Sequence, residues 1–454
     1  MASVNQSSLL HGMAGKLNAC SVAAKCSNRF VRLPAGSAHT RLRSLSQFAT
    51  SKVYEHPSWP KPSRMRMISS MAGAVGDGEE ADDRAELHRY GLMVDAAYLT
   101  YADVKKQPSG GEHYETVLSS ELDRLITTAG EDASRRRHVV TAHHFATIEP
   151  LPAVLDALPV VGGVDKTYWF GYVAVVRRDD CWDVVVAWRG SATLADWMMD
   201  MHVMKHVDFG GLDSGAGQVA EGFYNVYTSM DKEKKHGKVS AKEQVVKEVK
   251  RLVDHLRRRN DDHSGEKPVK VQVTVTGHSL GGALAMMTAH DVAAALAATA
   301  AGVRVRAITF GAPRVGDDAF RRALVARGVQ VFRVIVQQDI VPKLPMGDQY
   351  ADAGDYDIIN LDDGGRWLSP LELIQAHSLD LYLHLITLRN PAIASELCNS
   401  SSDAPPPPPA NGEHGGPPAN DEWVEMKEEE GYMRLPLKKL KEELDKLEGP
   451  SPRR

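Results

Sequence analysis

The sequence predicts an α/β protein in which a mostly parallel sheet is flanked by helices. Strand-like and helix-like segments alternate through the central part of the chain, an order typical of parallel strands joined by helical crossovers. The 454 residues are 43% apolar and 25% charged, so enough apolar side chains are present for a sizeable core. We expect one large domain over residues 85–395, with an extension at each end.

The strands are predicted from segments that are β-branched or that alternate apolar and polar residues. These segments are residues 169–176, 182–188, 269–275, 303–310 and 329–336. Helices are predicted where apolar residues recur every three or four positions, or where Ala and Met accumulate without Gly or Pro. These segments are residues 241–258, 283–301 and 317–327.

The charge and the cysteines exclude several classes of protein. A net charge of -5 leaves no strong basic field to hold phosphates, which argues against general nucleic-acid binding. The four cysteines, Cys20, Cys26, Cys181 and Cys398, show no metal-ligand spacing. We therefore expect a reducing compartment and no disulfide framework.

The amino-terminal residues 1–70 are predicted to be a disordered transit peptide. No Asp or Glu occurs before Glu55, whereas Ser, Ala, Lys and Arg recur. This composition is typical of organellar targeting, with a plastid favoured over a mitochondrion. The alternative is a basic arm that stays attached. No stretch reaches the roughly 20 apolar residues that span a bilayer.

The carboxyl-terminal part differs again in composition. Residues 396–420 form a Pro/Gly-rich linker that includes five consecutive prolines, and residues 421–454 hold an acidic segment followed by a short amphipathic helix. The apolar face of this helix is Leu437, Leu440, Leu444 and Leu447. The helix is expected to cap the central domain; the alternative is docking to a partner or a membrane surface.

A motif of the form G-x-S-x-G lies where a predicted strand meets a predicted helix. It consists of Gly277, His278, Ser279, Leu280 and Gly281. In a nucleophile elbow the chain turns too tightly for side chains at the two glycines, and the serine hydroxyl is raised above the sheet. The N–H of Leu280 would then face a developing oxyanion. These features predict an α/β-hydrolase fold with Ser279 as nucleophile.

The acid and the base of a serine hydrolase should follow the nucleophile, in that order. Asp339 lies just after a predicted strand and is favoured as the acid over Asp317, which is placed to cap the following helix. Among the later histidines, His377 stands at a loop-to-helix boundary and is favoured as the base. His384 lies two turns into that helix, where packing is expected, and His414 lies in the linker.

Two further features would complete such a site. Gly190 and Ser191 follow a predicted strand, so Ser191 is a candidate for the second oxyanion donor; the alternative is an ordinary strand-end turn. The apolar residues that follow are a candidate lid, and equally they could pack in the core beside Trp197. These residues are Met198, Met199, Met201, Val203 and Met204.

The motifs together resemble the plant class 3 lipases, specifically the plastid phospholipase A1-type acylhydrolases. The resemblance extends from about Arg89 to His384 and includes residues 186–190, 274–284, 310–316 and 339–342. It implies that Ser279, Asp339 and His377 form a triad and that Ser191, where the family usually has Thr, is the oxyanion-loop residue. After His384 the sequence departs from the family pattern, which leaves the substrate-facing carboxyl-terminal elements unassigned.

The function predicted from these features is a serine acylhydrolase that cleaves acyl esters of glycerolipids through an acyl-enzyme, as phospholipase A1, galactolipase or acylglycerol lipase. Its substrate would be lipid at a membrane or droplet surface, and no metal or organic cofactor is required. Two alternatives remain: an inactive lipase-like signalling or interaction protein, and a soluble carboxylesterase.

Overall fold

A computed structural model of the chain describes its central part and a short carboxyl-terminal segment. The described residues are 77–106, 114–128, 138–148, 167–178, 181–191, 205–210, 215–262, 269–300, 302–359, 375–388, 426–429 and 431–448. The predicted transit peptide, the candidate lid and the Pro/Gly-rich linker lie outside these residues.

Within the described residues, the strands form a nine-stranded sheet in the order β10-β11-β1-β2-β3-β6-β7-β8-β9. Its members are β1 (His138–Thr147), β2 (Thr167–Arg177), β3 (Cys181–Trp188), β6 (Lys270–His278), β7 (Arg304–Phe310), β8 (Gln330–Val336), β9 (Asp355–Ile359), β10 (Lys427–Glu429) and β11 (Tyr432–Arg434). The strands from β3 to β9 pair in parallel, as predicted, while those from β10 to β3 pair antiparallel. A separate pair is formed by β4 (His206–Asp208) and β5 (Gln218–Ala220).

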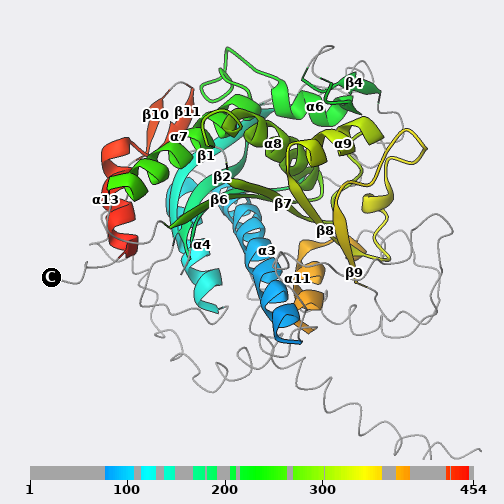
Figure 1. The fold of residues 1–454 in the computed structure, drawn as a ribbon, viewed down its shortest axis with the longest axis horizontal. Helices are drawn as coiled ribbons and strands as arrows, with labels where there is room; N and C mark the ends of the chain where they lie inside the picture. Colours follow the sequence, from blue (N-terminus) through cyan, green and yellow to red (C-terminus); the bar gives the residue numbers. More distant parts are fainter. Residues whose placement is uncertain are drawn as a thin grey trace, which may run out of the picture.

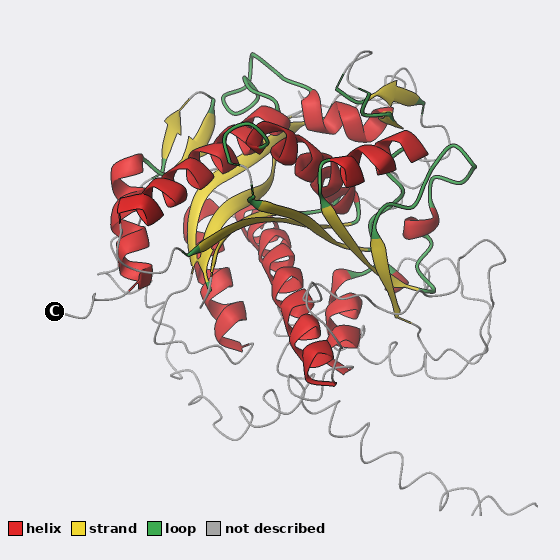
Figure 2. Cartoon of the chain, viewed as in Figure 1, coloured by secondary structure: helices red, strands yellow, loops and turns green. Residues whose placement is uncertain are grey.

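Helices cover both faces of the sheet, as Figures 1 and 2 show. One layer contains α3 (Asp77–Lys106), α4 (Tyr114–Thr128) and α11 (Leu379–Leu388); the other contains α6 (Glu221–Thr228), α7 (Ala241–Asp262), α8 (Leu280–Leu296) and α9 (Asp318–Ala326). Each layer encloses its own buried apolar cluster against the sheet. The predicted α/β fold is therefore confirmed.

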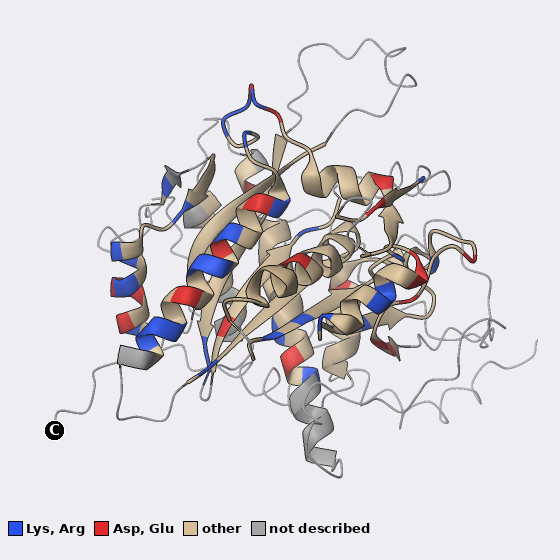
Figure 3. Ribbon diagram, turned by 45° about the horizontal axis from the view of Figure 1, so that its top comes forward, with Lys and Arg blue, Asp and Glu red and all other residues tan. Residues whose placement is uncertain are grey.

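The helix α7 shows how the apolar period decides which face is buried. Its Val245, Val249, Leu252, Val253 and Leu256 are fully buried, as expected from their spacing. Lys and Arg alternate with Asp and Glu on the outward surface of α7 and of α13 (Leu437–Glu448), as Figure 3 shows. The helix extends to Asp262, four residues beyond the predicted end.

The elements that carry the G-x-S-x-G motif meet more abruptly than predicted. The strand β6 continues to His278 instead of ending at residue 275, and α8 begins at Leu280 instead of residue 283. Only Ser279 therefore separates strand from helix. The small side chains of α8 allow it to be buried along most of its length against β3, β6 and β7.

The helix α3, which the sequence analysis did not predict, is joined to the sheet by buried ionic groups. The Glu86 carboxylate pairs with Arg306 on β7, 2.9 Å away, and with Arg178 after β2. Asp183 on β3 accepts hydrogen bonds from Tyr90 on α3 and from Thr274 on β6. These contacts hold the amino-terminal half of α3 against the sheet.

The carboxyl-terminal residues join the same sheet and the same core. The strand β11 pairs with β1, and β10 pairs with β11. Leu440 and Leu444 of α13 are fully buried in the cluster that also contains α7, so the helix packs on the domain. Leu437 was expected on this apolar face, but it is 55% exposed because it is the first residue of the helix. None of the described helices is both long and apolar enough to cross a membrane.

Candidate active site

The backbone at Ser279 makes a sharp turn between β6 and α8. Ser279 has φ 58° and ψ -127°, and it is the single non-glycine residue with positive φ in the described part of the chain. A Cβ atom on Gly277 would lie 2.2 Å from the Gly281 carbonyl oxygen, and one on Gly281 would lie 2.4 Å from that of Trp188. Both motif glycines are therefore required for this turn to pack against the end of β3.

The structure places Asp339 and His377 within hydrogen-bond distance of each other. Asp339 follows β8, is fully buried, and its Oδ2 lies 2.6 Å from His377 Nδ1. The same oxygen accepts a hydrogen bond from the Tyr382 hydroxyl on α11 at 2.7 Å, while Oδ1 accepts one from Val341 N–H at 2.9 Å. Because a carboxylate only accepts, Nδ1 of His377 carries a proton, and a neutral ring then leaves Nε2 as an acceptor.

Ser279 lies beside this pair. Its N–H donates to the Phe310 carbonyl at the end of β7, and the next residue, Gly311, contacts the pair. A Cβ atom on Gly311 would lie 3.0 Å from Asp339 Oδ2 and 3.1 Å from His377 Cε1. Ser279 Oγ and His377 Nε2 are both buried, with no hydrogen-bond partner among the described residues. These two atoms therefore do not hydrogen-bond to each other in this structure.

The loop after β3 also lies close to Ser279. A Cβ atom on Gly190 would be 3.0 Å from Ser279 Cβ. Arg189 holds this loop, because its Nε donates to the Trp169 carbonyl and its Nη1 to the Gly190 carbonyl, each at 2.8 Å. The Gly190 carbonyl belongs to the same peptide unit as the Ser191 N–H, so fixing one fixes the direction of the other.

Arg189 is almost completely buried between aromatic rings. Its guanidinium carbon lies 3.7 Å from the ring centroid of Tyr101 and 4.4 Å from that of Phe170. Burial lowers the pKa of Arg189, and the neighbouring Tyr101 and Tyr98 oppose this shift. The guanidinium of arginine keeps its charge in proteins. A cation therefore stands next to the loop where negative charge would develop in ester hydrolysis.

The remaining candidates take other positions. Asp317 caps α9 as predicted, since its side chain accepts from Phe320 N–H at 2.8 Å. His384 lies half-buried on α11, and burial lowers its pKa. His414 lies outside the described residues. Sequence reasoning missed Tyr382 and Arg189, although Tyr382 follows His377 by five residues and Arg189 lies within the predicted oxyanion segment.

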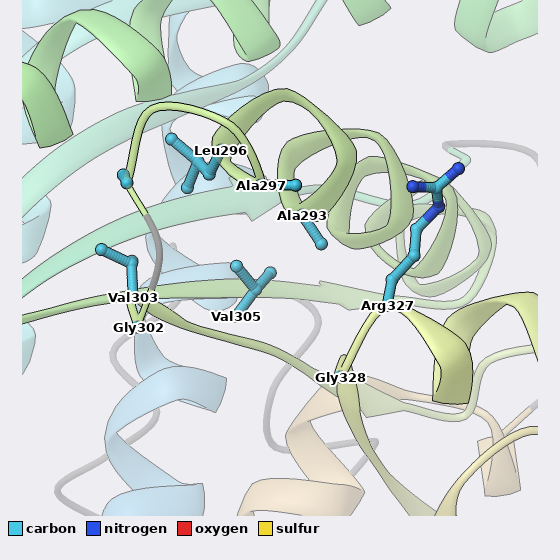
Figure 4. A pocket seen from close by; sticks show the side chains of 9 residues that line it. Ala293, Leu296, Ala297, Gly302, Val303, Val305, Arg327 and Gly328 are labelled. Carbon is cyan, nitrogen blue, oxygen red and sulfur yellow. The ribbon is translucent and has the colours of Figure 1, made fainter.

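A small pocket lies away from this arrangement. Figure 4 shows it at the carboxyl-terminal end of α8, where its lining includes Ala293, Leu296, Val303 and Arg327. Its volume is about 150 Å³. Ser279 lies at the opposite end of α8, which at 1.5 Å per residue is about 25 Å long. The pocket is therefore not a substrate site for Ser279.

Comparisons with known proteins agree with the resemblance seen in the sequence. Residues 185–349 match the family model for lipase (class 3). Phospholipase A1-II 6 of Oryza sativa subsp. japonica is 32% identical over 331 residues, covering 68% of this chain and 76% of that protein. The chloroplastic phospholipase A1-Igamma1 of Arabidopsis thaliana is 35% identical over 250 residues, covering 48% of this chain and 47% of that protein.

Among solved structures, a lipase from Rhizopus microsporus var. chinensis aligns with 68% of this chain and 85% of its own, at 18% identity and a TM-score of 0.38. The family assignment rests on the sequence relatives, of which the rice protein is matched over three quarters of its length. The chain therefore belongs to the class 3 lipases, the family of carboxylic ester hydrolases that includes the plant phospholipases A1.

Proposed function

We propose that the chain is a serine acylhydrolase that cleaves the acyl esters of glycerolipids, as its relatives named phospholipase A1 do. The observation that carries this proposal is the position of Ser279, in a left-handed turn at the start of α8 and beside the hydrogen-bonded Asp339 and His377. A serine hydroxyl needs a base to remove its proton and an acid to orient that base, and these residue types supply both.

In the first half of the proposed reaction, Ser279 Oγ attacks the ester carbonyl and its proton passes to His377 Nε2. The tetrahedral oxyanion is stabilised by the N–H groups of Leu280 and Ser191, and the amino terminus of α8 adds partial positive charge. The carbon–oxygen bond to the glycerol then breaks. The leaving alkoxide takes the proton from His377, and an acyl-enzyme remains on Ser279.

In the second half, water attacks the acyl-enzyme. His377 Nε2 removes a proton from the water, and the same two N–H groups stabilise the second oxyanion. Collapse returns the proton to Ser279 Oγ and releases the fatty acid. Asp339 would stabilise the imidazolium in both halves; its remaining hydrogen bonds, from Tyr382 and Val341, fix the carboxylate in place. Burial and then the charge of Asp339 raise the pKa of Tyr382 well above its usual value, so Tyr382 stays a donor.

A lipid substrate is favoured over a small soluble ester for two reasons. The relatives matched over most of their length are named phospholipase A1. Ser279 is only 2% exposed, so an acyl chain reaches it only after a covering segment moves, as expected for an enzyme that acts at a lipid surface. The residues proposed as a lid begin seven positions after Ser191 in sequence; they are Met198, Met199, Met201, Val203 and Met204.

The test is product analysis with the full-length protein. Vesicles of plant phospholipids and galactolipids, including phosphatidylcholine with different acyl chains at the two positions, should yield free fatty acid and lysolipid by mass spectrometry. Ser279→Ala should reduce the rate by roughly 10⁴-fold or more with an unchanged circular dichroism spectrum. Equal rates for the two proteins would refute the assignment of Ser279.

The same experiment separates the alternatives. A soluble carboxylesterase would hydrolyse short monomeric esters much faster than vesicles, whereas a lipase would show the reverse. An inactive lipase-like protein would neither release fatty acid nor react with a fluorophosphonate at Ser279. For a phospholipase A1, the acyl chain released from mixed-chain phosphatidylcholine should come from the first glycerol position.

We also propose that the protein acts in plastids, with residues 1–70 as the targeting segment. Relatives that match about half of this chain are named chloroplastic, and the acid-free amino terminus supports import. Residues 1–70 fused to a fluorescent protein should direct fluorescence to plastids in leaf cells. Fluorescence in mitochondria or throughout the cytosol would refute this proposal.

A further inference from the structure

A chain of hydrogen bonds connects Gly190, in the loop after β3, to the backbone of His377. It runs through two side chains that the proposed reaction does not require. The Gly190 N–H lies 2.8 Å from the Tyr98 hydroxyl. The same hydroxyl lies 2.9 Å from His278 Nδ1, and His278 Nε2 lies 2.8 Å from the carbonyl oxygen of His377. Tyr98 belongs to α3, which is remote in sequence from the other three residues.

The partners determine where each proton lies. A carbonyl oxygen can only accept, so His278 Nε2 carries a proton and donates it to His377. Burial, and then the neighbouring His377, hold the pKa of His278 well below its usual value, so the ring is neutral and its Nδ1 is an acceptor. The Tyr98 hydroxyl must therefore donate to Nδ1, which leaves its oxygen to accept the Gly190 N–H. Every donor in the chain is used, and all the bonds run in one direction.

This chain of hydrogen bonds holds the two segments that must be correctly placed around Ser279, the loop at Gly190 and the backbone of His377. At one end it holds Gly190, whose carbonyl is already fixed by Arg189, so both sides of the residue before Ser191 are anchored. At the other end it holds the backbone of His377, whose ring is fixed by Asp339 and lies against that of His278, with centroids 4.7 Å apart and a tilt of 33°. His278 itself precedes Ser279 directly.

We propose that Tyr98 and His278 are positioning residues that join the oxyanion loop to the backbone of His377, so that both are held in their reactive arrangement around Ser279. This inference rests on the proposed function. Neither side chain needs to touch the substrate. Their contribution is to keep the Ser191 N–H and His377 Nε2 in place, since a displacement of about 1 Å in such a site costs on the order of 100-fold in rate.

The test compares Tyr98→Phe with a matched control that removes a different hydrogen bond to the same helix. The Tyr172 hydroxyl on β2 donates to the Met93 carbonyl of α3 at 2.8 Å. Tyr172→Phe therefore also removes a buried hydrogen bond that holds α3, but it leaves the hydrogen bonds from Gly190 to His377 intact. Rates are measured with the full-length protein on p-nitrophenyl butyrate. Tyr98→Phe should lower kcat by about 10- to 100-fold with KM changed by less than about threefold. Tyr172→Phe should change kcat by less than about twofold, whatever its effect on Tm.

Variants of His278 add a second readout. His278→Phe keeps an aromatic ring at this position but removes both hydrogen-bonding nitrogen atoms. His278→Gln instead provides an amide N–H that can donate to the His377 carbonyl. We expect kcat to fall as in Tyr98→Phe for the first and to recover in part for the second. Because both residues act through one chain, the double variant Tyr98→Phe/His278→Phe should be little worse than the poorer single variant.

Two results would overturn the inference. One is an equal loss of kcat in Tyr98→Phe and Tyr172→Phe, which would reduce Tyr98 to a structural contact of α3. The other is a proton on Nδ1 of His278 by nitrogen NMR of the wild-type protein, because a neutral ring would then have no proton on Nε2 to donate to the His377 carbonyl. Both leave the proposed function standing. An active Ser279→Ala variant would instead remove the proposed function and this inference with it.

Discussion

Ser279 has a backbone conformation that serine rarely adopts, and the surrounding contacts maintain it. A non-glycine residue in a sparsely populated region costs about 1–3 kcal/mol. Here the Ser279 N–H donates to the Phe310 carbonyl, and the Ser279 carbonyl accepts from Gly282 N–H in the first turn of α8. The strand before and the helix after are both buried, so the turn between them cannot relax. The strain therefore lies at the candidate nucleophile.

Glu86 provides a prediction at the same scale. Burial raises the pKa of Glu86, but the charges of Arg306 and then Arg178 outweigh it and lower the pKa from 4.5 to about 2. Because the folded value is the lower one, ionised Glu86 stabilises the fold above about pH 4.5, and this contribution is lost as the pH falls towards 2. The difference in free energy of unfolding between wild type and Glu86→Gln should shrink by about 3 kcal/mol over this range.

The measurement is urea unfolding at a series of acidic pH values. Asp318→Asn is the control, because the pKa of Asp318 is also lowered, first by a hydrogen bond from Arg321, yet its ion pair is exposed to solvent. Screening should make its effect on unfolding much smaller. A Glu86→Gln protein whose acid unfolding parallels that of the wild type would show that Glu86 titrates normally in the folded state.

At the scale of elements, α3 joins the two ends of the parallel sheet. Glu86 pairs with Arg306 near the amino end of β7, and Tyr98 contacts Gly190, which follows β3, and His278, the last residue of β6. The 12 helical steps from Glu86 to Tyr98 span about 18 Å, which matches a strand of five or six residues. The helix α3 was not predicted from the sequence. The polar contacts that hold it, such as Tyr90 with Asp183 and Glu86 with Arg306, join residues that are 93 and 220 positions apart.

The strand β1 was also missed, for a related reason. Its sequence includes His138, His143 and His144, all buried, so no alternation of apolar and polar residues marks it as a strand. Its polar side chains are accommodated by neighbours from distant segments: Trp169 donates to His143 Nδ1 at 3.2 Å, and the ring of His144 lies 4.0 Å from that of Trp188. The alternation of apolar and polar residues identifies a strand with one buried and one exposed face, whereas both faces of β1 are buried.

The helix α13 carries a prediction at the element scale. Leu444 is fully buried against the core that contains α7, so Leu444→Ala should lower the free energy of unfolding by about 2–5 kcal/mol. Leu437→Ala on the same helix removes the same atoms from an exposed position and should change it by less than about 0.5 kcal/mol. Urea denaturation of the full-length variants measures both. Similar small effects would mean that α13 does not pack on the core in solution.

At the scale of the whole molecule, segments from both ends of the chain complete the domain. The class 3 lipase match covers residues 185–349, which include Ser279 and Asp339. His377, Tyr382 and Tyr98 lie outside that range, yet they contact the site within it. At the other edge of the sheet, β10, β11 and α13 extend the same sheet and core. The arrangement around Ser279 therefore requires residues from α3 to α11.

The sequence by itself determined the features that depend on neighbouring residues. The elbow needs only a strand, two glycines and a helix in succession. The five predicted strands and the predicted helices are present, most with shifted ends. The expected order of nucleophile, acid and base along the chain favoured Asp339 as the acid and His377 as the base. The structure places Asp339 Oδ2 2.6 Å from His377 Nδ1. Asp317 was rejected as the acid because it lies just before a predicted helix, and in the structure it caps that helix.

Only the tertiary structure decided which distant side chains surround Ser279. Tyr98, Arg189 and Tyr382 have no spacing that marks them, because a hydrogen bond between remote residues leaves no local pattern. Their distant partners are the Gly190 N–H, the Trp169 carbonyl and the Asp339 carboxylate, groups that become neighbours only after α3, β3 and α11 pack. Local geometry specifies the turn that carries the serine, and long-range packing specifies the groups that hold its proposed partners.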